Sequence, residues 1–161
     1  MKFLFLGDFL YDYDLIRDDI RSIGAELEKR GAAVVLNLEA PLKSPMPRKK
    51  WINLCNSDKV AEVLKILNTL AVNIANNHIL DWGRQGLEDL IRLLEENGIP
   101  FFGAGLNLQQ ALSPVLLKVD GKSIGFLGFG WKEEMCIYAG KKRPGVAPLK
   151  LPIILDSVRK L

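Results

Sequence analysis

The sequence predicts an α/β fold in which a mostly parallel sheet is flanked by helices. Short apolar segments of strand length alternate with longer segments whose apolar residues recur every three or four positions. Glycine or proline stands at several of the boundaries between these segments. Strands that alternate with helices favour right-handed crossover connections, which produce a parallel sheet with layered helices.

The first part of the chain predicts a strand, a helix and a second strand. Residues 2–7 are short and apolar and end at a Gly-Asp pair, which is typical of a buried strand. Residues 14–30 predict a helix, which Gly31 can end in the left-handed conformation. Residues 33–38 predict a second buried strand. The apolar stripe of the helix consists of Ile16, Ile20, Ile23 and Leu27.

The middle of the chain begins with an irregular segment at residues 40–56, where three prolines break any regular element. Ser57 is a suitable N-cap for a helix at 58–68. Residues 70–75 predict a third strand, and a helix at 84–97 follows it. Each helix has one apolar face, formed by Val60, Val63, Leu64 and Leu67 in the first and by Leu87, Leu90, Ile91 and Leu94 in the second.

The last part of the chain predicts shorter elements and a hairpin. In order, these are a strand at 99–102, a glycine turn at 103–105, one helical turn at 109–112, hairpin strands at 115–119 and 123–129, and a final helix at 151–161. The hairpin is predicted because Asp120-Gly121 is a favoured two-residue turn.

Composition limits the possible functions. Residues 1–161 have the size of a single domain that can bury a core, and 48% of them are hydrophobic. The formal net charge of +3 does not predict nucleic-acid binding without a concentrated basic surface. Cys55 and Cys136 lack CxxC spacing, which favours two free thiols over a single bridge. The first apolar run is too short for a signal peptide or a membrane span, so a cytoplasmic location is expected.

Three strand ends carry polar residues suited to metal chemistry. Asp8 follows the first predicted strand, Glu39 the second, and Asn77-His78 the third. Ligands of parallel sheets bind at the carboxyl ends of the strands, so these side chains should meet at one edge. Carboxylate and amide oxygens suit Mg²⁺, Mn²⁺ or Zn²⁺, which can activate water and neutralise charge on a phosphoryl or carbonyl oxygen. His78 could then act as an acid or base.

Each of these residues also has a structural alternative. Asp8 and the asparagines at 76–77 could serve only as turn residues. Glu39 could be a solvated loop acid, and His78 could simply satisfy a hydrogen bond. Asp81 could support the site, or it could be the N-cap of the helix that follows. These alternatives would have to hold together at three strand ends, which favours a common site.

Other sequence motifs are absent or admit two interpretations. There is no dinucleotide fingerprint, P-loop or serine-nucleophile elbow. The basic segment at residues 48–51 contains one tryptophan. It could be a solvated loop, or it could guide a polyanionic substrate electrostatically.

Several motifs together resemble the CapA family of poly-gamma-glutamate capsule-synthesis proteins, and the resemblance extends over nearly the whole chain. The Asn-Leu-Glu and Asn-Asn-His motifs are specific only in combination. The matching segments are Gly7-Asp8, Asn37-Leu38-Glu39-Ala40-Pro41-Leu42, Ala75-Asn76-Asn77-His78-Ile79-Leu80-Asp81-Trp82-Gly83, Gly103-Ala104-Gly105-Leu106-Asn107, Gln110-Ala111 and Gly145-Val146-Ala147.

The resemblance implies a calcineurin-like metallophosphatase fold with metals at the strand ends. Asp8 and Glu39 resemble the acidic metal ligands of the family, and Asn77 resembles its amide ligand. His78 resembles the adjacent catalytic histidine of the family. Asp81 falls at a family motif position, and the resemblance suggests a catalytic role for it. The family further implies capsule or poly-gamma-glutamate biosynthesis, with membrane-associated partners in some members.

The sequence departs from the family pattern in one respect. Family members continue with a His-Trp-Gly segment and a Gly-His-x-x-His segment, and neither occurs here. We therefore expect a truncated, N-terminal portion of the fold, with an open sheet edge, an exposed apolar face and an incomplete metal site.

Three functional hypotheses follow. The chain could be a metal-dependent enzyme, hydrolase-like or transferase-like, acting on phosphate or amide bonds of a phosphate or anionic polymer substrate. It could be a non-catalytic accessory protein. It could also be a half-protein, completed by a second chain or by a second copy of itself.

Overall fold

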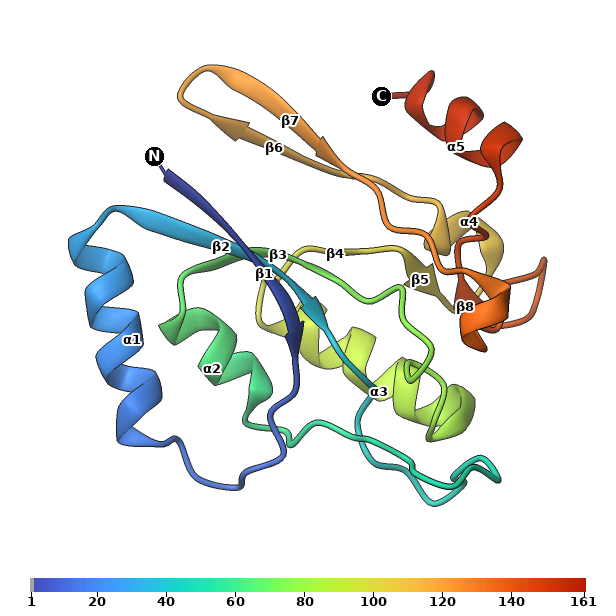
Figure 1. Ribbon diagram of the computed structural model, residues 1–161, viewed down its shortest axis with the longest axis horizontal. Helices are drawn as coiled ribbons and strands as arrows, with labels where there is room; N and C mark the ends of the chain where they lie inside the picture. The colour runs from blue at the N-terminus through green and yellow to red at the C-terminus, as the bar shows by residue number, and fades with distance from the viewer. Residues whose placement is uncertain (1) are drawn as a thin grey trace.

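The computed structural model describes residues 2–161 and has a four-stranded parallel sheet at its centre (Figure 1). This confirms the α/β class with helices flanking a parallel sheet. The metallophosphatase-like topology and the single domain at 1–161 stay predictions, and Met1 lies outside the described residues. The strands follow sequence order across the sheet: β1 (Lys2–Phe9), β2 (Ala32–Leu38), β3 (Thr69–Asn73) and β4 (Phe101–Phe102).

Three helices cover one face of this sheet and form the main core with it (Figure 1). They are α1 (Asp18–Lys29), α2 (Val60–Ile66) and α3 (Gly83–Glu96). The eight predicted apolar residues of α2, α3 and their flanks are all buried. Every second residue of β2 packs against the helices, because side chains alternate between the two faces of a strand.

A hairpin covers part of the opposite face. It consists of β6 (Val115–Val119) and β7 (Lys122–Phe126), which pair in antiparallel fashion around Asp120-Gly121 as predicted. Both turn residues have positive φ, 49° and 75°, as expected for a tight two-residue turn. The hairpin packs on β2, β3 and β4 through a second, smaller core.

The strand β1 differs from its prediction as a buried strand. It runs to Phe9, so Asp8 lies inside the strand, and most of its side chains are exposed; the Phe5 side chain is 66% exposed. The physical reason is its position, because β1 is at the sheet edge and the second core lies over β2–β4. β1 is thus an open sheet edge with exposed apolar side chains, and the truncation from which such an edge was expected stays a prediction.

Other differences concern element boundaries. The helix predicted at 14–30 begins only at Asp18. The helix predicted at 58–68 begins at Val60, so Lys59 and not Ser57 has the N-cap position. The Ser57 hydroxyl accepts a hydrogen bond from the Lys59 N–H at 3.2 Å, in the turn that precedes the helix. The glycine turn at 103–105 is wrong beyond its first residue, since the two residues that follow form a strand.

The remaining elements form a small unit beside the carboxyl ends of the sheet strands (Figure 1). The strands β5 (Ala104–Gly105) and β8 (Gly145–Val146) pair in antiparallel fashion. Between and after them lie α4 (Leu108–Ala111), the 3₁₀ helix η1 (Lys132–Glu134) and α5 (Leu151–Val158). Both cysteines are free thiols. Within residues 2–161, no helix is long and apolar enough to cross a membrane.

Replacing Gly24 by alanine should destabilise the protein, although alanine is the better helix former. A Cβ atom at this position of α1 would lie 2.4 Å from the carbonyl oxygen of Ile66 in α2, so the helices would have to separate. We expect the free energy of unfolding, measured by urea denaturation, to fall by about 1–3 kcal/mol despite a propensity gain of about 1 kcal/mol. Gly7→Ala is the matched control, because its Cβ would meet no atom within 4 Å. Equal losses for both variants would contradict the close packing of α1 on α2.

Candidate functional site

A row of polar side chains crosses the sheet near the carboxyl ends of β1, β2 and β3. Asp8 pairs with Asn37 in the strand register, and Asn37 pairs with Asn73. Paired residues of neighbouring strands point to the same face of a sheet, so the three side chains lie side by side. Glu39 follows Asn37 by two positions and reaches the same row.

Hydrogen bonds give this row one direction. The Ala75 N–H donates to the Asn73 side-chain oxygen at 3.2 Å, and the Asn73 amide group donates to the Asn37 oxygen at 2.9 Å. The Asn37 amide nitrogen can then only donate, and it does so to Asp8 Oδ1 and to Glu39 Oε2, each at 2.7 Å. The two carboxylate oxygens are therefore no farther apart than twice this distance. The predicted acidic pair is brought together.

Glu39 is not the solvated loop acid that one interpretation allowed, because its side chain is only 9% exposed. Burial raises the pKa of the Glu39 carboxyl group, and the negative charges of Asp8 and Asp81 add to this rise. The hydrogen bond from Asn37 and the nearby imidazole of His78 work in the opposite direction. A buried carboxylate beside a second carboxylate is a site that a cation would stabilise.

The backbone that carries Glu39 is held in an uncommon conformation. Ala40 has a φ of 67°, in the left-handed region that non-glycine residues rarely adopt. The buried Asn56 side chain donates to the carbonyl oxygens of Glu39 and Ala40 at 2.7 and 2.9 Å and accepts from the Tyr11 N–H at 2.9 Å. One asparagine thus joins the loops that follow β1 and β2 and directs Glu39 toward Asp8.

The two asparagines of the Asn-Asn-His motif have different environments. The buried Asn76 side chain donates to the Leu38 carbonyl oxygen at 2.9 Å and accepts from the N–H groups of Ala40 and His78 at 3.4 and 3.2 Å. It therefore has a structural role. Among residues 2–161, no hydrogen bond is found for the partly exposed Asn77 side chain. Its oxygen has no hydrogen-bond partner there, and the role of Asn77 as a metal ligand stays a prediction.

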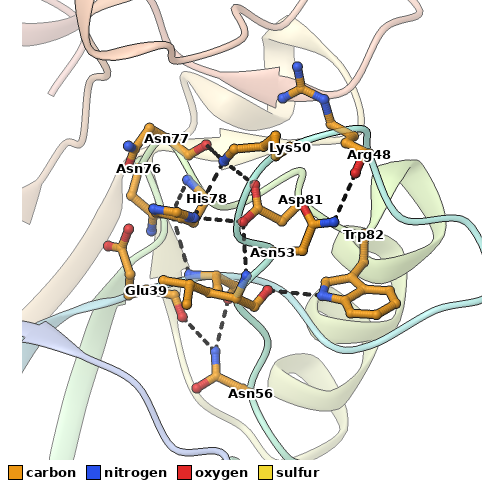
Figure 2. Close-up of polar contacts among 12 residues, drawn as sticks. Glu39, Arg48, Lys50, Asn53, Asn56, Asn76, Asn77, His78, Asp81 and Trp82 are labelled. Atoms are coloured by element: carbon orange, nitrogen blue, oxygen red, sulfur yellow. Dashed lines mark hydrogen bonds and ion pairs between the residues drawn. The ribbon is translucent and has the colours of Figure 1, made fainter.

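His78 and Asp81 form a hydrogen-bonded pair, with Lys50 completing the cluster (Figure 2). The His78 Nδ1 lies 2.6 Å from Asp81 Oδ2, and the Lys50 ammonium group bonds to Asp81 Oδ1. Because a carboxylate oxygen accepts hydrogen bonds, Nδ1 carries the proton, and a neutral ring then presents Nε2 as an acceptor. In Figure 2 the Glu39 carboxylate lies on the side of the imidazole opposite Asp81.

Asp81 is fully buried, and its carboxylate also accepts from the Leu54 N–H at 3.0 Å. The alternative in which Asp81 caps the next helix is wrong, because α3 has Trp82 at its N-cap position and no side-chain cap.

The basic segment at 48–51 is only partly solvated. Lys50 points inward to Asp81 and is 15% exposed at its side chain, whereas Trp51 is fully exposed.

The arrangement supplies two carboxylates, an unpaired amide oxygen and an oriented imidazole. Asn37, Asn73, Asn56 and Lys50 were not predicted as site residues. The sequence did contain a signal for Asn37. It is a polar residue inside an apolar strand, two positions before Glu39, so both side chains are expected on the same face. Nothing in the sequence pairs Lys50 with a residue 31 positions away. Within the described range 2–161, no group of three or more His, Cys, Asp or Glu residues is placed to hold a metal ion.

Comparison with known proteins places these motifs in a family. The model of the family described as bacterial capsule synthesis protein PGA_cap matches residues 2–161. The chain is 32% identical over 126 residues to the PGA biosynthesis protein CapA of Bacillus subtilis, covering 76% of this chain and 33% of that protein. It is 27% identical over 129 residues to the capsule biosynthesis protein CapA of Bacillus anthracis, covering 77% of this chain and 31% of that protein.

A third relative has a different description. The chain is 36% identical over 87 residues to a probable polyglutamine synthesis accessory protein of Mycobacterium tuberculosis, covering 52% of this chain and 23% of the relative. The chain thus spans about a third of the length of the two Bacillus relatives.

Asn56→Ala should lower the free energy of unfolding by about 2–4 kcal/mol, because the Tyr11 N–H and two carbonyl groups would lose a buried partner. Thermal and urea denaturation followed by circular dichroism measure this loss. Asn97→Ala is the matched control, since Asn97 interacts at the protein surface with Lys65 and Leu93. A cost for Asn56→Ala no larger than for Asn97→Ala would show that the loops do not depend on the asparagine.

Glu39→Gln should raise the melting temperature at neutral pH, measured in the presence of a chelator. Because the folded-state pKa of Glu39 is raised, the folded protein binds a proton more readily than the unfolded chain. Stability of the wild type is therefore lost as the pH rises from the ordinary Glu value of 4.5 through the raised pKa. The advantage of the glutamine variant should shrink as the pH falls through that window. The exposed Glu28→Gln change serves as a control, and a pH-independent loss of stability in Glu39→Gln would contradict the prediction.

Proposed function

Because the chain belongs to the family of bacterial capsule synthesis proteins, as the CapA-like motifs predicted, we propose that it acts in capsular poly-gamma-glutamate biosynthesis through a divalent metal site at the carboxyl edge of its sheet. One observation carries the proposal of a metal site. The carboxylates of Asp8 and Glu39 are held on a single Asn37 amide group. Two carboxylates held this closely repel each other, and a cation between them would remove that repulsion.

The available donors suit a hard cation. Asp8, Glu39 and the unpaired amide of Asn77 would supply oxygen ligands to Mg²⁺ or Mn²⁺, which commonly complete their coordination with water or substrate oxygens. Zn²⁺ fits less well, because its sites rely on nitrogen and sulfur ligands that this row lacks. The bound metal would supply Lewis-acid polarisation of a phosphoryl or carbonyl oxygen.

The His78–Asp81 pair supports an acid–base role. Asp81 holds the imidazole in one orientation and keeps the proton on Nδ1, which leaves Nε2 to accept a proton from a nucleophile or to return one to a leaving group. Lys50 forms an ion pair with the fully buried Asp81, so the carboxylate that orients His78 has a positively charged partner. These residues therefore support hydrolysis or transfer at a phosphate or amide bond.

A non-catalytic or shared role is the second candidate. It is supported by the exposed apolar edge at β1, where Phe5 and its neighbours are uncovered, and by the small donor set of the metal row. A second chain or a second copy packed on this edge would cover it and could contribute further ligands. The accessory description of the Mycobacterium tuberculosis relative agrees with such a role.

Titration calorimetry with MnCl₂ tests the metal site. Asp8→Ala and Asn77→Ala should each weaken Mn²⁺ binding by about tenfold or more, because each removes an oxygen ligand. Asp12→Ala, which removes an exposed carboxylate outside the row, should leave the affinity unchanged. Equal binding by all four proteins, the wild type included, would exclude the metal site.

The His78→Ala variant separates the two candidate roles. It should retain Mn²⁺ affinity but reduce the amount of capsular polymer when it replaces the natural protein in its host at equal abundance. Unchanged polymer would show that the His78–Asp81 pair is not catalytic and would favour the accessory role.

A further inference from the structure

One short segment contains the whole formal charge excess of the protein. Residues 131–150 include five basic and two acidic residues, and the formal net charge of the chain is +3. The other 141 positions are therefore balanced in charge. The basic residues are divided along the segment, with Lys132 near one end, the run Lys141-Lys142-Arg143 in the middle and Lys150 at the other end. The basic residues are Lys132, Lys141, Lys142, Arg143 and Lys150.

Three of these cations line a cleft of about 600 Å³. Lys132, Arg143 and Lys150 contribute the positive charge, and Glu133 is the one acidic residue among the lining residues of the described chain. Trp131 and Tyr138 add aromatic surface, and the Trp131 side chain is about half exposed. We call this feature the cationic cleft.

The charges in the cationic cleft are not neutralised by the protein. Among the ion pairs between residues 2–161, none involves Lys132, Arg143 or Lys150. Arg143 Nε donates to the Tyr138 carbonyl oxygen at 3.2 Å, and Lys150 Nζ lies 5.7 Å from the centre of the Tyr138 ring. Arg143 and Lys150 are thus held by neutral groups, and their charges remain available for a ligand.

The walls of the cleft are tied to the fold by backbone hydrogen bonds. Val146 of β8 donates to the Ile137 carbonyl oxygen at 2.8 Å, and Ala139 donates to Val146 at 2.9 Å. Gly130 donates to the carbonyl oxygen of Ala147 at 2.8 Å. The cleft is therefore formed before any ligand binds, which lowers the entropic cost of binding.

The cationic cleft lies beside the candidate metal site. In Figure 1 its segment, coloured orange to red, lies at the end of the molecule toward which β2 and β4 point. Cys136, in the wall of the cleft, is buried and is close enough for the negative charge of Glu39 to raise the pKa of its thiol, in addition to the larger effect of burial. The segment that forms the cleft and the candidate metal site therefore lie toward the same end of the molecule.

We propose that the cationic cleft binds a linear carboxylate polymer of the poly-gamma-glutamate class and holds it next to the candidate metal site. Such a polymer alternates pendant carboxylates with methylene groups. The ammonium and guanidinium groups match the carboxylates, and the faces of Trp131 and Tyr138 match the methylene groups. The identity of the polymer rests on the function proposed above, whereas its negative charge and its apolar groups are inferred from the residues that line the cleft.

Fluorescence anisotropy with a labelled poly-gamma-glutamate oligomer tests the cleft. Lys132→Ala/Lys150→Ala should weaken binding by about tenfold or more, because two charge-assisted contacts are lost. Lys141→Ala/Lys142→Ala removes the same charge from the same segment but outside the cleft lining, and should weaken binding by less than about threefold, the size expected of exposed and screened charges. All four lysines are exposed, and Arg143 is left in place because it bonds to the backbone.

Two results would overturn the proposal. Equal losses in the two double variants would show attraction to general surface charge rather than binding in the cleft. Tighter binding of an inorganic polyphosphate of matched charge would assign the cleft to phosphate instead of carboxylate. The metal site is tested separately, because both double variants should keep the Mn²⁺ affinity of the wild type. If the oligomer binds in the cleft but neither the wild type nor any variant binds Mn²⁺, the proposed polymer site is supported and the proposed metal site is excluded.

Discussion

The site depends on one asparagine amide group that donates to two carboxylates. Asn37 holds Asp8 and Glu39 at equal distances, and its own orientation is set by Asn73, which is in turn set by the Ala75 N–H. A chain of oriented amides therefore begins at a backbone group and ends between two negative charges. If the Asn37 group were reversed, an oxygen would face both carboxylates and its own partner Asn73 would lose its acceptor. The row has one low-energy arrangement for this reason.

Buried asparagines and one lysine hold the surrounding loops in place through hydrogen bonds and an ion pair, as Asn37 holds the two carboxylates of the row. Asn56 and Asn76 satisfy the backbone groups around Ala40, whose left-handed conformation costs about 1–3 kcal/mol by itself. Lys50 and the Leu54 N–H compensate the buried charge of Asp81. The Glu39 and His78 side chains are therefore positioned by polar contacts, in loops whose apolar residues, Ile79 and Leu80 among them, are buried in the main core.

The fold distributes its surfaces unequally, and the proposed functions follow from this. The helices cover one face of the sheet completely enough to bury the inward side chains of β2 and β3, whereas β1 keeps an exposed edge and Phe5 is largely in solvent. The carboxyl edge carries the acidic row, and the adjacent cleft carries the excess positive charge. These negative and positive groups do not pair with each other, so each can bind a partner of opposite charge. In our proposals the acidic row binds a cation and the cleft binds an anionic chain.

The sequence by itself determined the order of strands and helices, the apolar faces of α2 and α3, the hairpin at Asp120-Gly121 and the presence of acidic and amide groups at three strand ends. These features follow from local periodicity and turn chemistry, which a chain carries wherever it folds. Only the tertiary structure decided that β1 is an exposed edge, that Asn76 is structural while Asn77 is unpaired, and that Lys50 reaches Asp81. It also decided that three of the five basic residues in the segment 131–150 line one cleft. Burial and pairing between distant residues depend on how the elements pack, and the spacing of residues along the chain contains no record of that packing.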